Sequence, residues 1–459
     1  MKKIVIIGAG SSSFGPGTLA TIVRSPILRG SHIALVDLNE EALRPMQQVA
    51  ERMSAAWGAE MTVSASTDRR DVLQDADFVI VSIEVPPREV LWRMDWEIPL
   101  KHGLHQPYGE NGGPGGLMHA CRQIPPFIEI VRDMEALCPD AWLVNFSNPL
   151  PRITRAIYKY SRIKTVGLCH QLDVGYAIAA VLLADRYDYD IPANLDLHSD
   201  PANIENVRMV SRYGREHLEI KAAGLNHFTW MLDVRDRETG EDLYPALRKA
   251  LKSVRDDFEP LTMALFRVFD FCAVPGDTHL CEYIPWTHDP TAKPWEYFNL
   301  RLYDWKGNEA RRDLSRGTIA KMAVGEMAID PMRTTHSEGA AELIEAITSN
   351  SNYYADTVNI PNRGAIPNMP DDTVVELPAV ASGLGINGIS LPPLPASIAE
   401  LCRREAALVE MVVDAAVTGD RQIALQALLL DPMINDIKRA KAILDDYLTS
   451  FADYLPQFQ

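Results

Sequence analysis

The sequence predicts an α/β fold in which a doubly wound parallel sheet comes first and a mixed α+β, mainly helical part follows. In the first half, short apolar runs rich in β-branched residues alternate with amphipathic segments, which is typical of parallel strands covered by helices. Beyond about residue 195 the pattern becomes irregular and mostly helical. Apolar positions between 398 and 413, for example, fall on one face of a helix.

Five apolar runs in the first half are candidate strands of this sheet. They lie at 4–7, 33–36, 78–83, 142–146 and 165–168. Segments 40–57 and 125–137 have helical spacing, and 432–455 predicts another amphipathic helix that ends before Pro456. Residues 359–397 are dense in Pro, Gly and Asn, so we expect a long ordered loop there.

Composition limits the classes of partner. The 459 residues carry a formal net charge of -17, which repels nucleic-acid phosphates and anionic lipid, so we expect neither partner and favour small-molecule chemistry. Six cysteines without paired spacing predict reduced thiols and a cytoplasmic location. No apolar run is long enough to predict a membrane span.

The first apolar run leads into a glycine-rich turn, IVIIGAGSSSFG, and a helix can follow from Pro16. Glycines there allow a tight turn and a close approach to a pyrophosphate, although the spacing is not the strict GxGxxG. Asp37 ends the next apolar run, where a carboxylate would bind the ribose 2′-hydroxyl of NAD. The alternative is a glycine-rich turn that binds nothing. We expect the cofactor to contact Gly8, Gly10, Ser12, Phe14, Gly15 and Asp37.

Polar clusters follow later strands. Asn148 lies in NFSNP after the run at 142–146, and Cys169 and His170 follow the run at 165–168. Ligands of open parallel sheets bind at the carboxyl ends of strands, so these clusters should face the cofactor crevice. Further along come GLNHFTW, with Asn226 and His227, and PGDTHLCEY, with Asp277 and His279. Taken singly, each is explained as well by a buried small hydrophobe or a satisfied polar residue.

Together and in this order, the motifs resemble glycoside hydrolase family 4, the NAD- and metal-dependent glycosidases. The resemblance extends over the glycine turn, TDRRDVLQDADFVI, ENGGPGG, NFSNP, GLCHQ, GLNHFTW, PGDTHLCEY and TGDRQIALQALLLDP. It implies a lactate/malate dehydrogenase-like fold, with an NAD-binding Rossmann-type domain at 1–195 and a substrate-binding, metal-binding and oligomerisation domain at 196–459. It also implies a homodimer or homotetramer.

The resemblance implies that Cys169 and His227 hold a divalent ion, usually Mn²⁺, although ligand chemistry alone would suggest zinc or iron. It implies transient oxidation of the sugar at C3 by NAD, removal of the C2 proton, elimination of the aglycone, addition of water and re-reduction. Asp277 is the candidate base. His170 stands where 6-phospho-α-glucosidases carry an acid, or only contacts the sugar. Asn148 and Asn226 would bind the substrate.

Several features depart from the family pattern. Trp92 stands where phosphosugar members carry a phosphate-binding arginine, so we expect an α-glycoside of an unphosphorylated hexose or hexuronic acid. Gln171 matches no familiar subgroup, and an apparent insertion around 196–217 lengthens the interval between Cys169 and His227. Two alternatives stay open: a lactate/malate-type 2-hydroxy acid dehydrogenase, and a catalytically inactive NAD-sensing protein.

Overall fold

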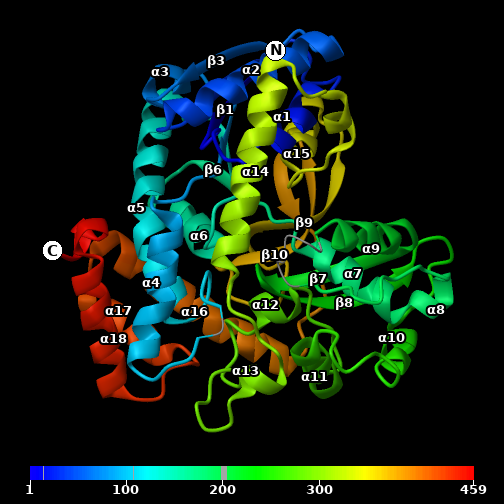
Figure 1. Ribbon diagram of the computed structural model, residues 1–459, viewed down its shortest axis with the longest axis vertical. Helices are drawn as coiled ribbons and strands as arrows, with labels where there is room; N and C mark the ends of the chain where they lie inside the picture. The colour runs from blue at the N-terminus through cyan, green and yellow to red at the C-terminus, as the bar shows by residue number, and fades with distance from the viewer. Residues whose placement is uncertain (14, 107, 198–203) are drawn as a thin grey trace.

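The N-terminal strands form the parallel part of a twisted sheet (Figure 1). The computed structural model describes residues 1–13, 15–106, 108–197 and 204–459. Within them the parallel strands run in the order β3-β2-β1-β4-β5-β6, which is the strand order of dinucleotide-binding sheets. Their bounds are β1 Lys3–Ile7, β2 His32–Val36, β3 Thr62–Ser66, β4 Phe78–Val81, β5 Trp142–Asn145 and β6 Lys164–Gly167.

All five strands predicted in this half are confirmed. Alternate side chains of β1 enter different cores, Ile4 and Ile6 on one face of the sheet and Val5 and Ile7 on the other, because successive side chains of a strand point to opposite faces. Burial on both faces explains the unbroken apolar runs. Strand β3 was not predicted, since its sequence TVSAS is short, largely polar and only partly buried at the sheet edge.

Helices cover both faces of the parallel strands (Figure 1). Helix α2 has the predicted bounds, since the Asn39 side chain caps its N-terminus and Gly58 ends it at φ 66°. The helices of this half are α1 Gly15–Val23, α2 Glu40–Trp57, α3 Arg70–Leu73, α4 Arg88–Lys101, α5 Gly113–Leu137, α6 Leu150–Tyr160, α7 Leu172–Leu182 and α8 Ala184–Tyr187.

The second half extends the same sheet with antiparallel strands: β7 Leu218–Leu225, β8 Phe228–Asp236, β9 Tyr353–Pro361, β10 Val374–Ser382 and β11 Gly385–Gly388. The prediction of a loop over 359–397 is therefore wrong in part. Strand β10 lies between β9 and β7 and is almost entirely buried. Its Pro378 is accommodated at a register shift between Leu377 and Ala379, where a missing N–H costs little.

The remaining helices are α9 Ile204–His217, α10 Tyr244–Ala250, α11 Pro260–Phe269, α12 Gly276–Leu280, α13 Pro294–Tyr297, α14 Trp305–Val324, α15 Ala340–Ser349, α16 Ala396–Thr418, α17 Arg421–Leu430 and α18 Ile437–Ser450. Helix α15 packs on β9 and β10, whereas α16, α17 and α18 pack on α4, α5 and α6 of the first half. The insertion at 196–217 supplies α9, which packs on α7, while 198–203 lie outside the described residues. Helix α14 runs from this half to α2 (Figure 1).

The predicted domain boundary at 195/196 falls between α8 and α9 and stays a prediction, because one sheet passes through both halves. Helix α18 is shorter than the predicted segment 432–455. In the described part of the chain, no helix combines the length and apolar character that crossing a membrane requires.

Candidate functional site

The glycine turn after β1 is fastened to the end of β2. The N–H of Gly10 donates to Asp37 Oδ2 at 2.8 Å, and the other carboxylate oxygen accepts from the N–H of Asn39. Gly8 has φ 84°, and a Cβ there would lie 2.0 Å from the carbonyl oxygen of Ser82. No other residue type fits that position. This geometry suits a dinucleotide turn, and the contacts predicted with the cofactor stay predictions.

The rest of the turn meets α14 and α2. The Ser315 hydroxyl on α14 donates to the carbonyl oxygen of Ser12 at 2.8 Å. A Cβ on Gly15, at the start of α1, would lie 2.7 Å from the methyl carbon of Met46. Phe14 lies outside the described residues. Helix α14 therefore links the turn directly to the second half of the chain.

Cys169 and His227 lie together at the carboxyl edge of the sheet. Cys169 follows β6, and His227 sits in the turn between β7 and β8 with φ 61°. Cys169 Sγ is 3.5 Å from His227 Nε2. A sulfur and a nitrogen bound to one ion at about 2.3 and 2.1 Å can be this far apart. The two residues predicted as ligands are thus placed where one cation could bind both.

Two further donors, Glu110 and His279, lie beside His227. Their ligand atoms and one of His227 all lie within 4.8 Å of one another. The Glu282 carboxylate contacts the surroundings of both donors. One of its oxygens accepts hydrogen bonds from the N–H groups of Asn111 and Gly112, the two residues that follow Glu110. The other oxygen lies 3.0 Å from His279 Nδ1. A proton on Nδ1, donated to Glu282, leaves Nε2 of His279 with its lone pair.

The surroundings of His227 suit a metal ligand. Burial and the neighbouring imidazoles of His279 and His170 hold the pKa of His227 well below its usual value, and the neutral ring is the form that binds metals. Asn111 Nδ2 lies 2.9 Å from His227 Nδ1, while Asn111 Oδ1 is buried without a partner. If the amide turned over, Oδ1 would accept a proton on Nδ1 and leave Nε2 free to bind an ion, at the cost of the hydrogen bond that Nδ2 donates to Glu110 Oε2 at 3.1 Å.

Glu110 is held from a second direction. His119 Nδ1 lies 2.8 Å from the carbonyl oxygen of Glu110, and His119 Nε2 lies 3.0 Å from Glu84. The Arg88 guanidinium comes within 3.7 Å of Glu110 Oε1. Glu110 and His279 were missed as site residues although both lie in the quoted motifs ENGGPGG and PGDTHLCEY. Nothing in the spacing of 110, 227 and 279 indicates that these side chains converge.

The two predicted substrate-binding asparagines each carry an unused acceptor. Asn148 Oδ1 and Asn226 Oδ1 are buried without a partner, and Asn226 Nδ2 donates to Glu376 at 2.6 Å. A buried amide oxygen without a donor is costly unless a ligand or water supplies one.

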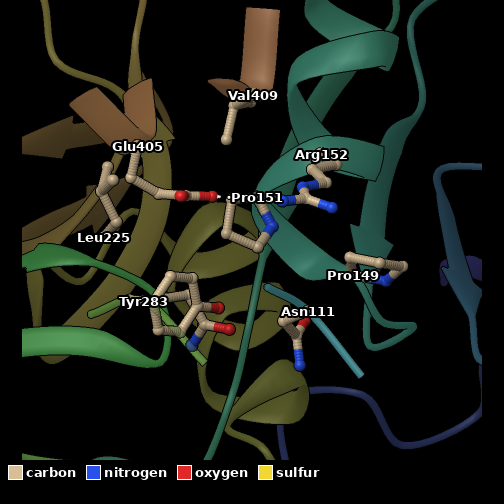
Figure 2. Close-up of a pocket in the computed structure, with 9 residues that line it drawn as sticks. Asn111, Pro149, Pro151, Arg152, Leu225, Tyr283, Glu405 and Val409 are labelled. Atoms are coloured by element: carbon tan, nitrogen blue, oxygen red, sulfur yellow. Dashed lines mark hydrogen bonds and ion pairs between the residues drawn. The ribbon is translucent and has the colours of Figure 1, made fainter. Parts of the chain in front are cut away.

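Asn111 and Asn226 line a small cavity together with Arg152, Tyr283 and Glu405 (Figure 2). It has about 10 Å³ of room for the centre of a water molecule. Arg152 Nη1 and the Oδ1 atoms of both asparagines lack partners. The space therefore suits one bridging water and is too small for a sugar ring.

The two predicted catalytic residues have contrasting environments. The His170 side chain is 61% exposed, and its Nδ1 lies 2.5 Å from Glu338 Oε1. The Glu338 carboxylate raises the pKa of His170 to about 9. Asp277 is fully buried on α12. Its carboxylate accepts hydrogen bonds from the N–H groups of Leu261 and Thr262 and from the Thr262 hydroxyl, all in the first turn of α11.

A nucleotide-type sheet with thiol, imidazole and carboxylate donors at its carboxyl edge defines a class of enzymes that combine a dinucleotide with a metal ion. Residues 3–182 match the family model for family 4 glycosyl hydrolases, and residues 222–434 match the model of the C-terminal domain of that family. The chain therefore belongs to glycosyl hydrolase family 4, which confirms the resemblance of its motifs.

Known proteins resemble the chain over nearly its whole length. An α-glucosidase from Erwinia rhapontici is 32% identical, and the match covers 96% of each chain. The crystal structure of the putative glucosidase lplD from Bacillus subtilis has a TM-score of 0.82 and 25% identity, and the match covers 98% of this chain and 100% of that one. A 6-phospho-α-glucosidase from gut microorganisms, solved with NAD and Mn²⁺, has a TM-score of 0.74 at 22% identity, with both chains fully covered.

Proposed function

We propose that the chain hydrolyses α-glycosides of an unphosphorylated hexose or hexuronic acid with the help of NAD and Mn²⁺. Membership of family 4 makes it a glycoside hydrolase. The observation that carries the proposal is the approach of Cys169 Sγ to His227 Nε2 beside a dinucleotide-type turn. A 2-hydroxy acid dehydrogenase is not favoured, since the family match accounts for both halves of the chain.

The same residues that the sequence predicts are proposed to hold the two cofactors. Gly8, Gly10, Ser12, Gly15 and Asp37 would bind NAD, together with Phe14. Cys169 and His227 would bind Mn²⁺, with Glu110 as a third donor. Bound there, NAD would supply a reversible hydride acceptor for C3, and the cation would supply a Lewis acid that makes the C2 proton more acidic.

Protein groups orient the sugar and move its protons. Asn148 Oδ1 accepts a hydrogen bond from a sugar hydroxyl, which satisfies this orphaned oxygen, and Asn226 binds the sugar through the water in the small cavity. His170, exposed beside Cys169 and oriented by Glu338, donates a proton to the departing aglycone.

Two groups compete for the role of the C2 base. His279 belongs to the donor cluster, and because Glu282 lies 3.0 Å from its Nδ1, its Nε2 is the nitrogen left to act as a base. Asp277 could act as the base only after releasing the N–H groups of α11. We therefore propose His279 as the base and regard Asp277 as a residue that positions α12.

We also propose a cytoplasmic homodimer or homotetramer. The six cysteines are all free thiols, which agrees with a reducing compartment. Exposed apolar side chains such as Val268 and Trp286, 74% and 44% exposed, favour self-association. Sedimentation analysis of the purified protein measures the oligomeric state.

Hydrolysis in D₂O tests the function directly. Oxidation at C3 followed by proton removal should place deuterium at C2 of the released sugar, with no net accumulation of NADH. Glycosidases that use two carboxylates leave C2 untouched. Aryl α-glycosides of glucose, galactose, glucuronic acid and galacturonic acid, with NAD⁺, Mn²⁺ and a thiol reductant, provide the substrate panel. A product without deuterium at C2 would contradict the proposed route.

A further inference from the structure

Strand β10 carries a buried carboxylate that the proposed reaction does not use. Glu376 is 1% exposed and accepts hydrogen bonds from three neutral side chains: Asn226 Nδ2 at 2.6 Å, Asn359 Nδ2 at 3.1 Å and the Thr229 hydroxyl at 3.1 Å. Within the described part of the chain, no cationic side chain forms an ion pair with it. Burying a carboxylate without a cation is costly, so its contacts point to a role other than packing.

Two of the three donors lie on either side of His227. Asn226 precedes it and Thr229 follows two residues later, so the carboxylate holds both ends of the turn between β7 and β8. His227 has φ 61° in this turn. That conformation costs a non-glycine residue on the order of 1 kcal/mol and persists only where surrounding contacts fix it. Glu376 supplies two of these contacts and so helps to orient the imidazole.

The third donor leads to Cys169. Asn359, on β9, is the register partner of Gly167, the last residue of β6. The two strands approach so closely here that a Cβ on Gly167 would lie 3.1 Å from the Cβ of Asn359. Cys169 comes two residues later in the chain. One carboxylate oxygen, Oε2, therefore links the strand end that leads to Cys169 with the turn that carries His227.

We propose that Glu376 is a positioning residue that sets the separation between Cys169 and His227. The inference rests on the proposed function, in which these two residues bind Mn²⁺, and adds a residue to it. Cys169 Sγ and His227 Nε2 are 3.5 Å apart, a separation that one ion can bridge. Replacing a residue that orients metal ligands without touching the ion typically lowers metal affinity or activity about 10- to 100-fold.

The test compares two substitutions of Glu376. Glu376→Leu removes the acceptor for all three donors. Glu376→Gln keeps the size of the side chain and one oxygen, which can accept from both asparagines, while the Thr229 hydroxyl can accept instead of donate. The control is Asp236→Leu, which removes a largely buried carboxylate from the opposite end of the same hairpin, where Asp236 pairs with Leu218.

Two measurements report on the metal site itself. Titration calorimetry gives the dissociation constant of Mn²⁺ at a temperature at which circular dichroism shows each variant to be folded. Co²⁺ in place of Mn²⁺ gives a thiolate charge-transfer absorption only while Cys169 binds the ion. A purely structural role of Glu376 would lower the midpoint of thermal unfolding and leave both quantities unchanged in the folded protein.

We expect the Mn²⁺ dissociation constant to rise about 10- to 100-fold in Glu376→Leu, with loss of the Co²⁺ thiolate absorption. It should change less than about threefold in Glu376→Gln, which keeps the acceptor, and less than about twofold in Asp236→Leu. Unchanged Mn²⁺ binding in folded Glu376→Leu would overturn the proposal. An equal loss in Glu376→Gln, which would show that only the charge matters, or in Asp236→Leu would overturn it as well.

Thr229→Val decides the question if Glu376→Leu does not fold. It removes one donor and leaves the carboxylate in place, so the Mn²⁺ dissociation constant should rise about fivefold, as loss of one hydrogen bond predicts. An unchanged constant would overturn the proposal.

A wild type that binds no Mn²⁺ contradicts the proposed function instead, and hydrogen exchange in excess chelator then decides separately about Glu376. Faster exchange over residues 165–171 and 224–230 in Glu376→Leu or Thr229→Val, but not in Asp236→Leu, supports the positioning role. Exchange that is unchanged, or equally faster in the control, overturns it.

Discussion

At the scale of single residues, the environment of Cys169 makes its role depend on a cation. Burial and the carboxylates of Glu338 and Glu376 raise the pKa of the Cys169 thiol well above its usual value, and a bound divalent ion reverses that effect and binds the thiolate. Cys169→Ser should therefore weaken Mn²⁺ binding at least about tenfold and remove most activity. Titration calorimetry with Mn²⁺ measures the affinity, and circular dichroism checks the fold. Full activity in excess chelator would contradict the metal site.

Deuterium exchange in two variants separates the candidate bases. His279→Gln removes the imidazole lone pair and should stop both turnover and incorporation of deuterium at C2. Asp277→Asn replaces a charged cap of α11 and should cost about 1–2 kcal/mol of stability while part of the exchange survives. NMR of the product sugar and Mn²⁺ titration of each variant are the measurements. Loss of exchange only in a well-folded Asp277→Asn would assign the base to Asp277.

Cofactor choice depends on the charge of Asp37. Its carboxylate already binds the N–H of Gly10, so Asp37→Asn preserves an acceptor while removing the repulsion of a 2′-phosphate. We expect the preference for NAD over NADP to fall at least about tenfold, a change of about 1.4 kcal/mol. Activation curves with the two cofactors measure it. A wild type that uses both equally would contradict the ribose contact.

The sequence predicted site residues that lie close together in the chain, but it did not predict site residues that meet only through contacts between distant segments. Gly8, Gly10 and Asp37 belong to one strand, turn and strand, so their geometry follows from local pattern. Glu110 lies in the segment before α5 and His279 on α12, and Glu282 joins the two. No periodic pattern of the local sequence indicates that these side chains meet in space.

At the scale of secondary structure, β10 shows why pattern reasoning failed between 359 and 397. Its strand VVELPAVAS contains a proline and a glutamate that resemble loop residues. The glutamate, Glu376, is buried because Asn226, Asn359 and Thr229 all donate to it. Partners from three other segments thus make a polar residue compatible with a buried strand, and only the assembled sheet reveals them.

The pair Arg152–Glu405 fastens α6 to α16 beside the small cavity (Figure 2). Both side chains are buried, and burial raises the pKa of Glu405 to about 7. Arg152→Leu leaves Glu405 without its partner and should destabilise the protein by about 3–5 kcal/mol at pH 8. The double variant Arg152→Leu/Glu405→Leu should recover most of this loss. Denaturant unfolding measures both, and equal stability of the single and double variants would contradict the coupling.

Asp431, which ends α17, gives a stability that depends on pH. Burial raises its pKa from 3.8 to about 6, so its ionisation opposes folding and stability falls as pH rises from about 4 through 6. Asp431→Asn keeps the acceptor for the N–H of Met433 and should be more stable than the wild type above pH 6, by on the order of 2–3 kcal/mol. Below pH 4 the two should coincide. Unfolding at several pH values tests this, and a constant difference would refute it.

At the scale of the whole molecule, one sheet joins the two halves. Strand β6 of the parallel part pairs with β9, and α14 packs along α2 and touches the cofactor turn. Neither half can open without exposing an edge strand and the core beneath α14. Membership of family 4 could be predicted from the motifs, but this continuity could not, because it depends on β9 and β10, which come about 190 residues after β6 in the chain.

The shared sheet predicts that the chain unfolds in one cooperative calorimetric transition, because the contacts between its halves resemble a core more than a domain interface. NAD⁺ at 100 times its dissociation constant should stabilise the whole protein by about 2.7 kcal/mol and move the entire transition to higher temperature. The control is Asp37→Arg, which should weaken NAD⁺ binding and show a smaller shift at the same NAD⁺ concentration. Scanning calorimetry with and without NAD⁺ gives the answer. Two separate transitions, of which NAD⁺ moves only one, would show that the nucleotide-binding half and the sugar-binding half fold independently in spite of their common sheet.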